Sequence, residues 1–198
     1  MKAPDFYIID LPADNQEYIR QTADLVYRGF KGYSPAWPNM KAALKEVRNT
    51  LKDGRISRIA LDKKGKVLGW IGGISEYHGY SWELHPLIVD PEHRRQGIGA
   101  ILVQDLEQQV KKRGGGNIYL GTDDETGRTS LAGRDLYPDV LKNLMKIKNI
   151  NGHPYEFYQK VGFTLVGVIP DANAPGKPDI IMAKRVSNLK QGAFKRGE

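Results

Sequence analysis

Apolar and polar positions along this chain predict alternating short strands and helices. Short apolar stretches with β-branched or aromatic members are typical of strands, and apolar residues at three- and four-residue spacing are typical of helices. Strands are predicted at residues 6–10, 56–61, 67–75, 84–89, 117–122, 163–169 and 180–185. Helices are predicted from a cap at Asp14 or Asn15 to Gly29, from Asn39 through Val47, from Ile98 to Val110, and over residues 140–150 and 154–161.

The predicted strand at residues 84–89 and the turn behind it combine two unusual features. Pro86 has no N–H for a regular ladder, so we expect a bulge or a splayed strand at this point. Gly97 and Gly99 then open a helical pattern, and two arginines precede them. The first N–H groups of a helix attract anions, and glycines let an anion approach the backbone. The stretch therefore predicts a turn that binds a pyrophosphate, although it is neither a Walker A loop nor the six-position dinucleotide pattern.

Composition limits the other possibilities. The chain has 198 residues, of which 40% are hydrophobic and 27% charged, as in a soluble globular protein with a substantial core. It contains no cysteine, which excludes disulfides, a thiolate zinc site and a cysteine nucleophile. No apolar run reaches the length of a membrane span, and no repeat or linker divides the chain. We expect a cytoplasmic protein that does not bind a membrane, with one domain over residues 1–186 and a basic tail over residues 187–198.

The net charge of +7 does not decide the function. Four of these seven charges lie in the last fifteen residues, so the rest of the chain is only mildly basic. A nucleic-acid-binding module would explain the charge, but the tail lacks interleaved aromatic residues apart from Phe194, so we expect no nucleic acid. A ligand with several phosphate groups, such as coenzyme A, explains a mildly basic chain equally well.

Five motifs in order give this chain a family resemblance. Arg94-x-x-Gly97-x-Gly99 resembles the acetyl-coenzyme A signature of the GNAT N-acetyltransferases. The other four, within residues 67–185, are similar to the aminoglycoside 6′-N-acetyltransferases: Trp82-Glu-Leu-His-Pro-Leu87, Ile118-Tyr-Leu-Gly-Thr-Asp-Asp124, His153-Pro-Tyr-Glu-Phe-Tyr158 and Lys177-Pro-Asp-Ile180. The first sixty residues match only in the order of their elements. The resemblance implies an α/β (α+β) protein with the GNAT fold, a mixed, mostly antiparallel twisted sheet of about six to seven strands with helices on both faces.

The resemblance also implies how the residues near the turn act. Glu83 would hold the acceptor amine and accept its proton, directly or through water. In a regular strand His85, two residues after Glu83, would point to the same face as Glu83, and a structural role for it stays open. If Pro86 splays the strands, the freed Leu87 N–H would polarise the acetyl carbonyl, although normal ladder pairing stays open. Tyr158 would protonate the departing thiolate, and packing in the core is the alternative for this aromatic residue. The residues expected to hold acetyl-coenzyme A, which acts as co-substrate without any metal, are Leu87, Ile88, Val89, Arg94, Arg95, Gln96, Gly97, Ile98, Gly99 and Ala100.

An acidic cluster after a central strand indicates the acceptor. Neighbouring carboxylates there would attract a substrate with several ammonium groups, whereas the cluster alone could equally be a solvated turn. Tyr33 and Trp37, in an aromatic loop, would either line this site or pack against the core. Together with the resemblance, the acceptor-binding residues are expected to be Tyr77, Glu83, Asp123, Asp124 and Asp135.

These observations predict an acyltransferase that acetylates the 6′-amine of an aminoglycoside and so confers antibiotic resistance. Because the chain has no cysteine to carry the acetyl group, the amine is expected to attack the thioester directly within a ternary complex. Relatives are often dimers, so a homodimer is expected. A polyamine, a peptide N-terminus or a lysine are alternative acceptors, since the fold hosts many of them, and a coenzyme A-binding domain without activity is a further alternative.

Overall fold

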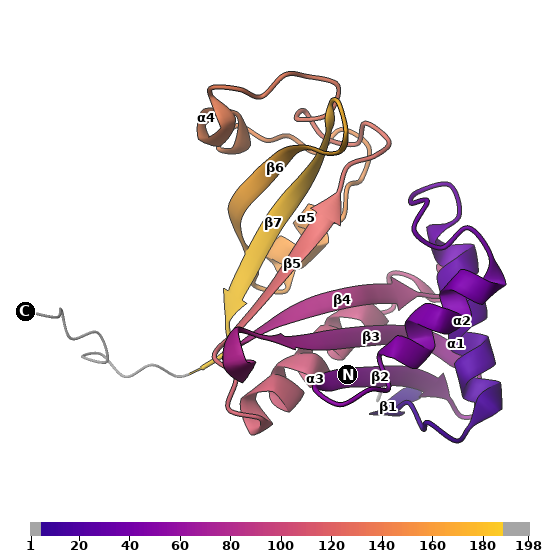
Figure 1. The fold of residues 1–198 in the computed structure, drawn as a ribbon. Helices are drawn as coiled ribbons and strands as arrows, with labels where there is room; N and C mark the ends of the chain where they lie inside the picture. Colours follow the sequence, from indigo (N-terminus) through magenta and orange to yellow (C-terminus); the bar gives the residue numbers. More distant parts are fainter. Residues whose placement is uncertain (1–4, 188–198) are drawn as a thin grey trace, which may run out of the picture.

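The computed structural model describes residues 5–187 of the chain, whose seven strands form one sheet (Figure 1). The strand order is β1-β2-β3-β4-β5-β7-β6, and every neighbouring pair is antiparallel except β4 and β5. This architecture confirms the predicted fold class. The strands are β1 (Phe6–Asp10), β2 (Arg55–Asp62), β3 (Val67–Glu76), β4 (Ser81–Val89), β5 (Asn117–Asp123), β6 (Thr164–Ala174) and β7 (Lys177–Arg185).

Helices cover both faces of the sheet, and two of them begin at asparagine caps. The side chain of Asn15 accepts the N–H of Tyr18, and that of Asn39 accepts the N–H of Ala42, as predicted. Each such cap contributes about 1 kcal/mol to helix stability. Within residues 5–187, no helix combines the length and apolar character needed to cross a membrane. The helices are α1 (Gln16–Phe30), α2 (Met40–Asn49), α3 (Ile98–Lys112), α4 (Val140–Leu144) and α5 (Tyr155–Lys160), with 3-10 turns η1 (Tyr77–Gly79) and η2 (Pro91–His93).

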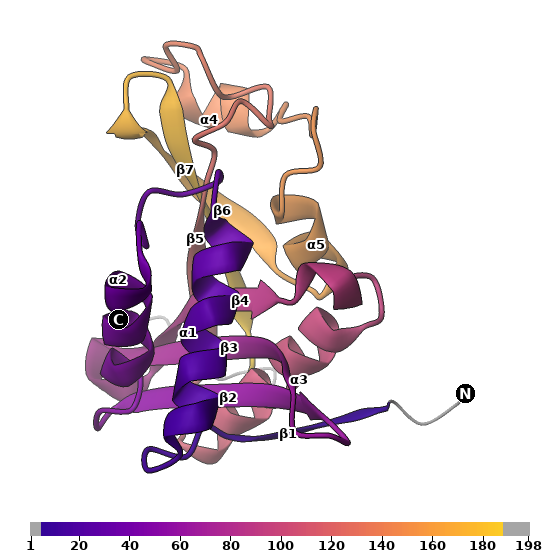
Figure 2. The ribbon, with the colours of Figure 1, turned by 90° about the vertical axis from the view of Figure 1, so that its right-hand side faces the viewer.

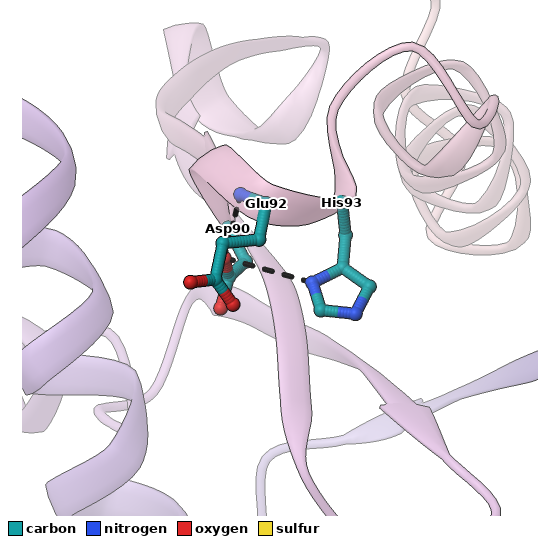
Figure 3. A group of neighbouring side chains, drawn as sticks. All are labelled: Asp90, Glu92 and His93. Carbon is teal, nitrogen blue, oxygen red and sulfur yellow. Dashed lines mark hydrogen bonds and ion pairs between the residues drawn. The ribbon is translucent and has the colours of Figure 1, made fainter.

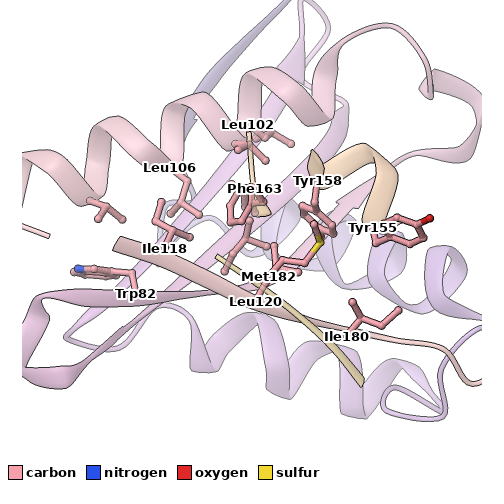
Figure 4. Packing of buried hydrophobic residues seen from close by; sticks show 14 of the residues in the cluster. Trp82, Leu102, Leu106, Ile118, Leu120, Tyr155, Tyr158, Phe163, Ile180 and Met182 are labelled. Carbon is pink, nitrogen blue, oxygen red and sulfur yellow. The ribbon is translucent and has the colours of Figure 1, made fainter. Parts of the chain in front are cut away.

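Two hydrophobic cores lie on opposite faces of the sheet. Helices α1 and α2 pack over β2 and β3 on one face, where Trp70 is fully buried, and α3 packs on the other face (Figure 2). Leu102 and Leu106 of α3 lie over Ile118 of β5, and α5 closes the same core with Tyr158 (Figure 4). The cores hold the sheet between two helical layers, so any site has to form where the strands separate.

Strands β4 and β5 separate in the middle of the sheet. They pair in parallel only from Ser81 to Glu83, opposite Asn117 to Tyr119, and then diverge (Figure 1). On their outer edges, β5 pairs with β7 from Asn117 to Asp123, and β4 pairs with β3 from Ser81 to Val89. Beyond Glu83, one edge of β4 therefore has no neighbouring strand among residues 5–187.

A bulge interrupts β4 at the place where Pro86 predicts one. His85 and Pro86 together lie opposite the single residue Gly72 of β3, and the peptide bond between them is cis. A Cβ atom on Gly72 would lie 2.2 Å from the carbonyl oxygen of His85, so only glycine fits here. The backbones of β3 and β4 therefore approach each other closely at Gly72.

The bulge changes which residues of β4 face each side of the sheet. Trp82 and Leu84 pack into the α3 core before the bulge, and Leu87 and Val89 pack against the same core after it. Glu83, between the first two, consequently lies on the face that α1 and α2 cover.

Two predicted elements differ from the structure. Helix α4 ends at Leu144, although a helix was predicted to residue 150, because the backbone of Lys148 and Asn149 pairs with the segment at residues 129–130 instead. Strands β6 and β7 extend to Ala174 and from Lys177, so the predicted long loop between them is a short turn. The predicted basic tail lies outside the described residues apart from residue 187.

Candidate active site

The buried carboxylate of Asp90 fixes the start of the turn between β4 and α3. Its Oδ1 accepts the N–H of Glu92 at 3.0 Å, and its Oδ2 lies 3.4 Å from Lys66 Nζ and 3.8 Å from Arg28. Burial raises the pKa of Asp90, but the Glu92 N–H and the Lys66 ammonium outweigh it, so the pKa lies below its ordinary value. His93 also approaches, with Nδ1 3.6 Å from Asp90 Oδ1 (Figure 3). Because Lys66 and Arg28 already compensate Asp90, this cluster anchors the turn rather than offering a cation site.

The turn leads into a helix start that no side chain caps. Arg95 and Gly97 adopt left-handed conformations, with φ of 62° and 83°, and Gly97 is the cap residue of α3. The N–H groups of Ile98, Gly99 and Ala100 therefore have no partner within the helix. The side chain of Ile98 is buried in the core, so this residue offers only its backbone. The exposed side chains of Arg94, Arg95 and Gln96 surround these N–H groups, which fits the pyrophosphate of coenzyme A.

The free edge of β4 provides further backbone groups. Asp90 donates its N–H to Leu68 of β3 at 2.8 Å, and alternation along an antiparallel ladder then directs Ile88 toward β3 as well. The N–H and C=O groups of Leu87 and Val89 point the other way, toward the side that β5 has left. The Val89 carbonyl accepts from Arg94 Nε at 3.4 Å, while the Leu87 groups and the Val89 N–H are suited to pair with the amides of an extended ligand or to donate to a carbonyl oxygen.

The face opposite α3 carries a row of polar residues near this edge. On β5 and β7 the buried residues alternate with half-buried or exposed ones, so Tyr119, Asp123 and Asp179 share the face of Glu83. Burial, followed by the charge of Glu83, raises the pKa of Tyr119, which places that carboxylate beside the phenol. We call Glu83, Tyr119, Asp123 and Asp179 the acidic face.

His85 lies on the same face as Glu83, because the bulge follows it. Its Nε2 is 3.9 Å from Glu46 of α2, and its ring centroid is 6.0 Å from that of Trp37. Trp37 also packs on Phe30 at 4.6 Å, so the aromatic loop between α1 and α2 lies beside the bulge. The guanidinium of Arg128, which follows β5, stacks 5.3 Å from the ring centroid of Tyr33 in this loop. The two loops thus contact each other through Arg128 and Tyr33.

Asp123 is held at the exposed end of β5 by two contacts. Its Oδ1 accepts from Asn173 of β6 at 2.6 Å, and its carbonyl lies 3.1 Å from Nε2 of the buried His153. Burial lowers the pKa of His153, and its Nδ1 accepts the N–H of Tyr155, so the neutral ring donates from Nε2 to Asp123. The imidazole therefore positions the strand end that presents the Asp123 carboxylate.

Asp124, which was expected to bind the acceptor, has a structural position instead. It is only 1% exposed, and its two carboxylate oxygens accept the N–H groups of Arg128 and Thr129, both at 2.7 Å. The carboxylate stabilises the loop after β5 and has no exposed oxygen for a substrate ammonium. The structure therefore contradicts the expectation that Asp124 binds the acceptor.

The other two expected acceptor residues lie in different places. Tyr77 is highly exposed in η1, and its contribution to the raised pKa of Tyr119, after burial, Glu83 and Glu76, places it near the acidic face. Asp135 is exposed on the loop before α4, where its carboxylate accepts the N–H of Tyr137 at 2.9 Å. Tyr77 thus acts on Tyr119, the residue that pairs with Glu83, whereas Asp135 lies on the loop.

Tyr158 lies in the α3 core, on the opposite face of the sheet. Its ring packs edge-on against Phe157 at 5.2 Å and Phe163 at 5.7 Å, and burial raises the pKa of its phenol (Figure 4). Phe157 in turn lies against Gly99, where an added Cβ would be 3.3 Å from its ring. Helix α5 therefore adjoins the first turn of α3.

Asp179 is a site residue that the sequence analysis missed. It belongs to the quoted motif Lys177-Pro-Asp-Ile180, and the apolar residues that follow it indicated a strand. Alternation along β7 gives the face on which Asp179 lies, whereas its position opposite Asp123 follows from the register of β5 and β7, which sequence periodicity does not reveal. Extending the predicted strand back to Lys177 would have placed Asp179 opposite the buried face.

Comparisons with known proteins agree with this geometry. Residues 23–136 match the family model described as the acetyltransferase (GNAT) family. A crystal structure of an aminoglycoside 6′-N-acetyltransferase complexed with coenzyme A is 38% identical, with a TM-score of 0.85, over 93% of this chain and 99% of that one. The aminoglycoside 6′-N-acetyltransferase from Enterococcus faecium is 37% identical over the same shares of both chains, with a TM-score of 0.84. Among curated proteins, no match to this sequence was found.

Proposed function

This chain belongs to the GNAT acetyltransferase family, and we propose that it transfers an acetyl group from acetyl-coenzyme A to the 6′-amine of an aminoglycoside. The observation that carries the proposal is the position of Glu83. It belongs to the last residue pair between β4 and β5, so its carboxylate lies where the acidic face meets the open edge of β4. An amine held by Glu83 would therefore lie next to an acetyl group held along that edge. The similarity to two aminoglycoside 6′-N-acetyltransferases over almost the whole chain supports this acceptor.

Different residues would bind acetyl-coenzyme A, polarise its thioester and deprotonate the acceptor. The first turn of α3, with Arg94 and Arg95, holds the pyrophosphate of acetyl-coenzyme A. The Leu87 N–H donates to the thioester oxygen as negative charge develops on it. Glu83 accepts a proton from the acceptor ammonium, directly or through water. The proton has to leave because an ammonium has no lone pair, whereas the resulting amine can attack the thioester.

Tyr158 is proposed to protonate the sulfur that leaves. Burial raises its pKa, so the phenol is protonated at neutral pH but is a weaker acid than an exposed tyrosine. A thiolate is already a weak base near neutral pH, so this step contributes modestly. No cysteine is present to carry the acetyl group, and attack is therefore direct within a ternary complex.

Thiol release from acetyl-coenzyme A in the presence of different amines tests the proposal. We expect rapid turnover with kanamycin, loss of turnover with an aminoglycoside that has a hydroxyl in place of the 6′-amine, and slow turnover with spermidine or a lysine peptide. A faster reaction with spermidine would instead support the second candidate, a polyamine acetyltransferase, which the carboxylates of the acidic face also favour. Coenzyme A binding without turnover of any amine would refute both.

We further propose that the protein is a homodimer, acts in the cytoplasm and confers aminoglycoside resistance on its host. An apolar surface on α4 and β6 supports the dimer: β6 is an edge strand, and Leu141, Met145, Val166 and Ile169 are each more than half exposed. A second copy of the chain would cover these side chains. A sedimentation mass near twice the 22.2 kDa of one chain, reduced by Met145→Glu, is expected, and a monomer at all concentrations would contradict it.

A further inference from the structure

Lys184 of β7 contacts two helices at once. Its Nζ donates to Oε1 of Glu107 in α3 at 2.5 Å, and to the carbonyl oxygen of Val161, at the end of α5, at 2.6 Å. Glu107 is buried, and the side chain of Lys184 is mostly shielded from solvent. The same ammonium lies 6.0 Å from the ring centroid of Phe163, which packs edge-on against Tyr158 (Figure 4). The lysine therefore bridges α3 and the end of α5.

A glycine makes room for this ammonium. Gly162 follows Val161 with a φ of 93°, a left-handed conformation that commonly ends a helix and that glycine adopts without strain. A Cβ atom on Gly162 would lie 3.1 Å from both Cε and Nζ of Lys184, which is tighter than an ordinary contact. The residue that ends α5 thus also lets the lysine lie close against the backbone.

The bridge has more effect on geometry than on stability. Removing two charges from water cancels much of their mutual attraction, so a buried ion pair often stabilises a fold no better than apolar side chains of similar size. The hydrogen bonds of such a pair are nevertheless short and directional, so they fix the distance between the groups that they join. Here the joined groups belong to different helices, and what the bridge fixes is the position of α5 relative to α3.

These two helices carry different parts of the proposed site. The first turn of α3 would hold the pyrophosphate of acetyl-coenzyme A, and Tyr158 of α5 would protonate its sulfur. Phe157 lies against Gly99 in that first turn. Glu107 lies eight residues, or about 12 Å, further along α3. Because the two contacts are well separated, they fix the direction of α5 along α3 as well as its distance.

We propose that Lys184 is a positioning residue for acetyl transfer. By bridging Glu107 and the end of α5, it holds the Tyr158 phenol in place relative to the turn that binds acetyl-coenzyme A. This inference rests on the proposed function, because Lys184 acts through the proposed acid and transfers no proton itself.

A double-mutant cycle with Tyr158→Phe tests the inference. The variant E107Q/K184M removes both charges of the bridge, so neither is left unpaired. The matched control is K160M, which removes an exposed charge from the same helix. In single-turnover experiments with kanamycin, we expect acetyl transfer to slow about fivefold in E107Q/K184M, and not to slow further when this pair is combined with Y158F. The KM for each substrate should stay within about twofold of wild type, and K160M should match wild type throughout. A purely structural role would instead slow transfer by the same factor with and without Tyr158.

Hydrogen exchange provides a readout that does not depend on turnover. The N–H groups of residues 161–163 donate to carbonyls of α5, so their exchange should be faster in E107Q/K184M than in K160M. Unchanged exchange at the end of α5, or an equal loss of rate in the presence and absence of Y158F, would overturn the inference and leave the proposed function intact. A wild-type protein that acetylates no amine would refute the proposed function and the inference with it. If E107Q/K184M does not fold, E107Q alone, which keeps the lysine and weakens its bridge, carries the same comparison.

Discussion

Glu83 is the residue whose side chain joins the two halves of the proposed site. Its carboxylate is expected to remove the proton that keeps the acceptor amine from attacking, so E83Q keeps the shape of the side chain and loses the base. We expect kcat to fall about a hundredfold or more, with little change in the KM for acetyl-coenzyme A. Steady-state kinetics with both substrates varied measure this, and Glu17→Gln, on the exposed face of α1, is the control. A kcat within twofold of wild type would exclude Glu83 as the base.

Asp179 makes a second prediction at the scale of one residue, on stability. Its pKa is about 6 in the folded protein, above the ordinary value of 3.8, because burial and neighbouring negative charge disfavour its ionised form. The folded state therefore binds more protons than the unfolded state between about pH 4 and pH 6, and this residue costs stability as the pH rises through that window. D179N lacks the titration. We expect its melting temperature to exceed that of wild type at pH 7, with the difference shrinking toward pH 4.

Thermal unfolding of both proteins across this pH range measures the effect. Carboxylates distant from Asp179 titrate equally in both proteins, so the difference between the two curves reports Asp179 together with its coupled neighbours Asp123 and Glu83. A difference that is constant from pH 4 to pH 7 would show that Asp179 is not the titrating group.

At the scale of an element, the bulge in β4 decides which side chains reach the acidic face. It depends on Gly72, because any Cβ there would meet the carbonyl oxygen of His85. Gly72→Ala is expected to displace the bulge, lower stability by about 1–3 kcal/mol and reduce kcat, since Leu87 and Glu83 move with it. Gly167→Ala is the matched control, because an added Cβ on this β6 glycine comes no closer than 3.9 Å to Ile181. Denaturation and kinetics of both variants test the prediction, and equal behaviour of the two would contradict it.

The same strand shows how far the sequence alone could lead. A proline in an apolar strand predicted the bulge, and paired glycines before a helical pattern predicted the turn, because both features arise from backbone chemistry within a few residues. Which face Glu83 occupies depends on the residues that β4 opposes in β3. That pairing joins residues distant in the chain, so periodicity within one strand does not contain it.

The acidic residues likewise show that the sequence alone does not tell which side chains belong to the site. Asp123 and Asp124 are adjacent and chemically identical, yet one ends the strand exposed and the other binds two backbone N–H groups of its own loop. Asp179 lies opposite Asp123 only through the register of β7 with β5. The sequence shows where acidic residues gather, but only the pairing of the strands shows which of them lie together on one face.

At the scale of the whole molecule, one continuous sheet connects β1 to β6, and on this basis we propose that residues 1–186 form a single domain. The sheet separates two fields of opposite sign. Arginines and a helix start surround the turn at the head of α3, whereas carboxylates lie on the acidic face across the open edge of β4. A phosphate-bearing co-substrate and a polycationic acceptor can therefore approach one protein from different sides.

This arrangement predicts the sign of a salt effect. The net charge of +7 by itself would repel a polycation, so screening it with salt would speed the association of an aminoglycoside. The local carboxylates would attract the polycation, so screening them would slow its association.

Because the Debye length falls from about 10 Å at 0.1 M to about 3 Å at 1 M salt, charges close to the bound substrate dominate. We expect kcat/KM to fall as salt rises both for kanamycin and for the oppositely charged acetyl-coenzyme A. Measuring both constants between 0.05 and 0.5 M salt, about a threefold change in Debye length, tests this. A kcat/KM for kanamycin that rises with salt would show that the net charge, and not the acidic face, governs the approach of the acceptor.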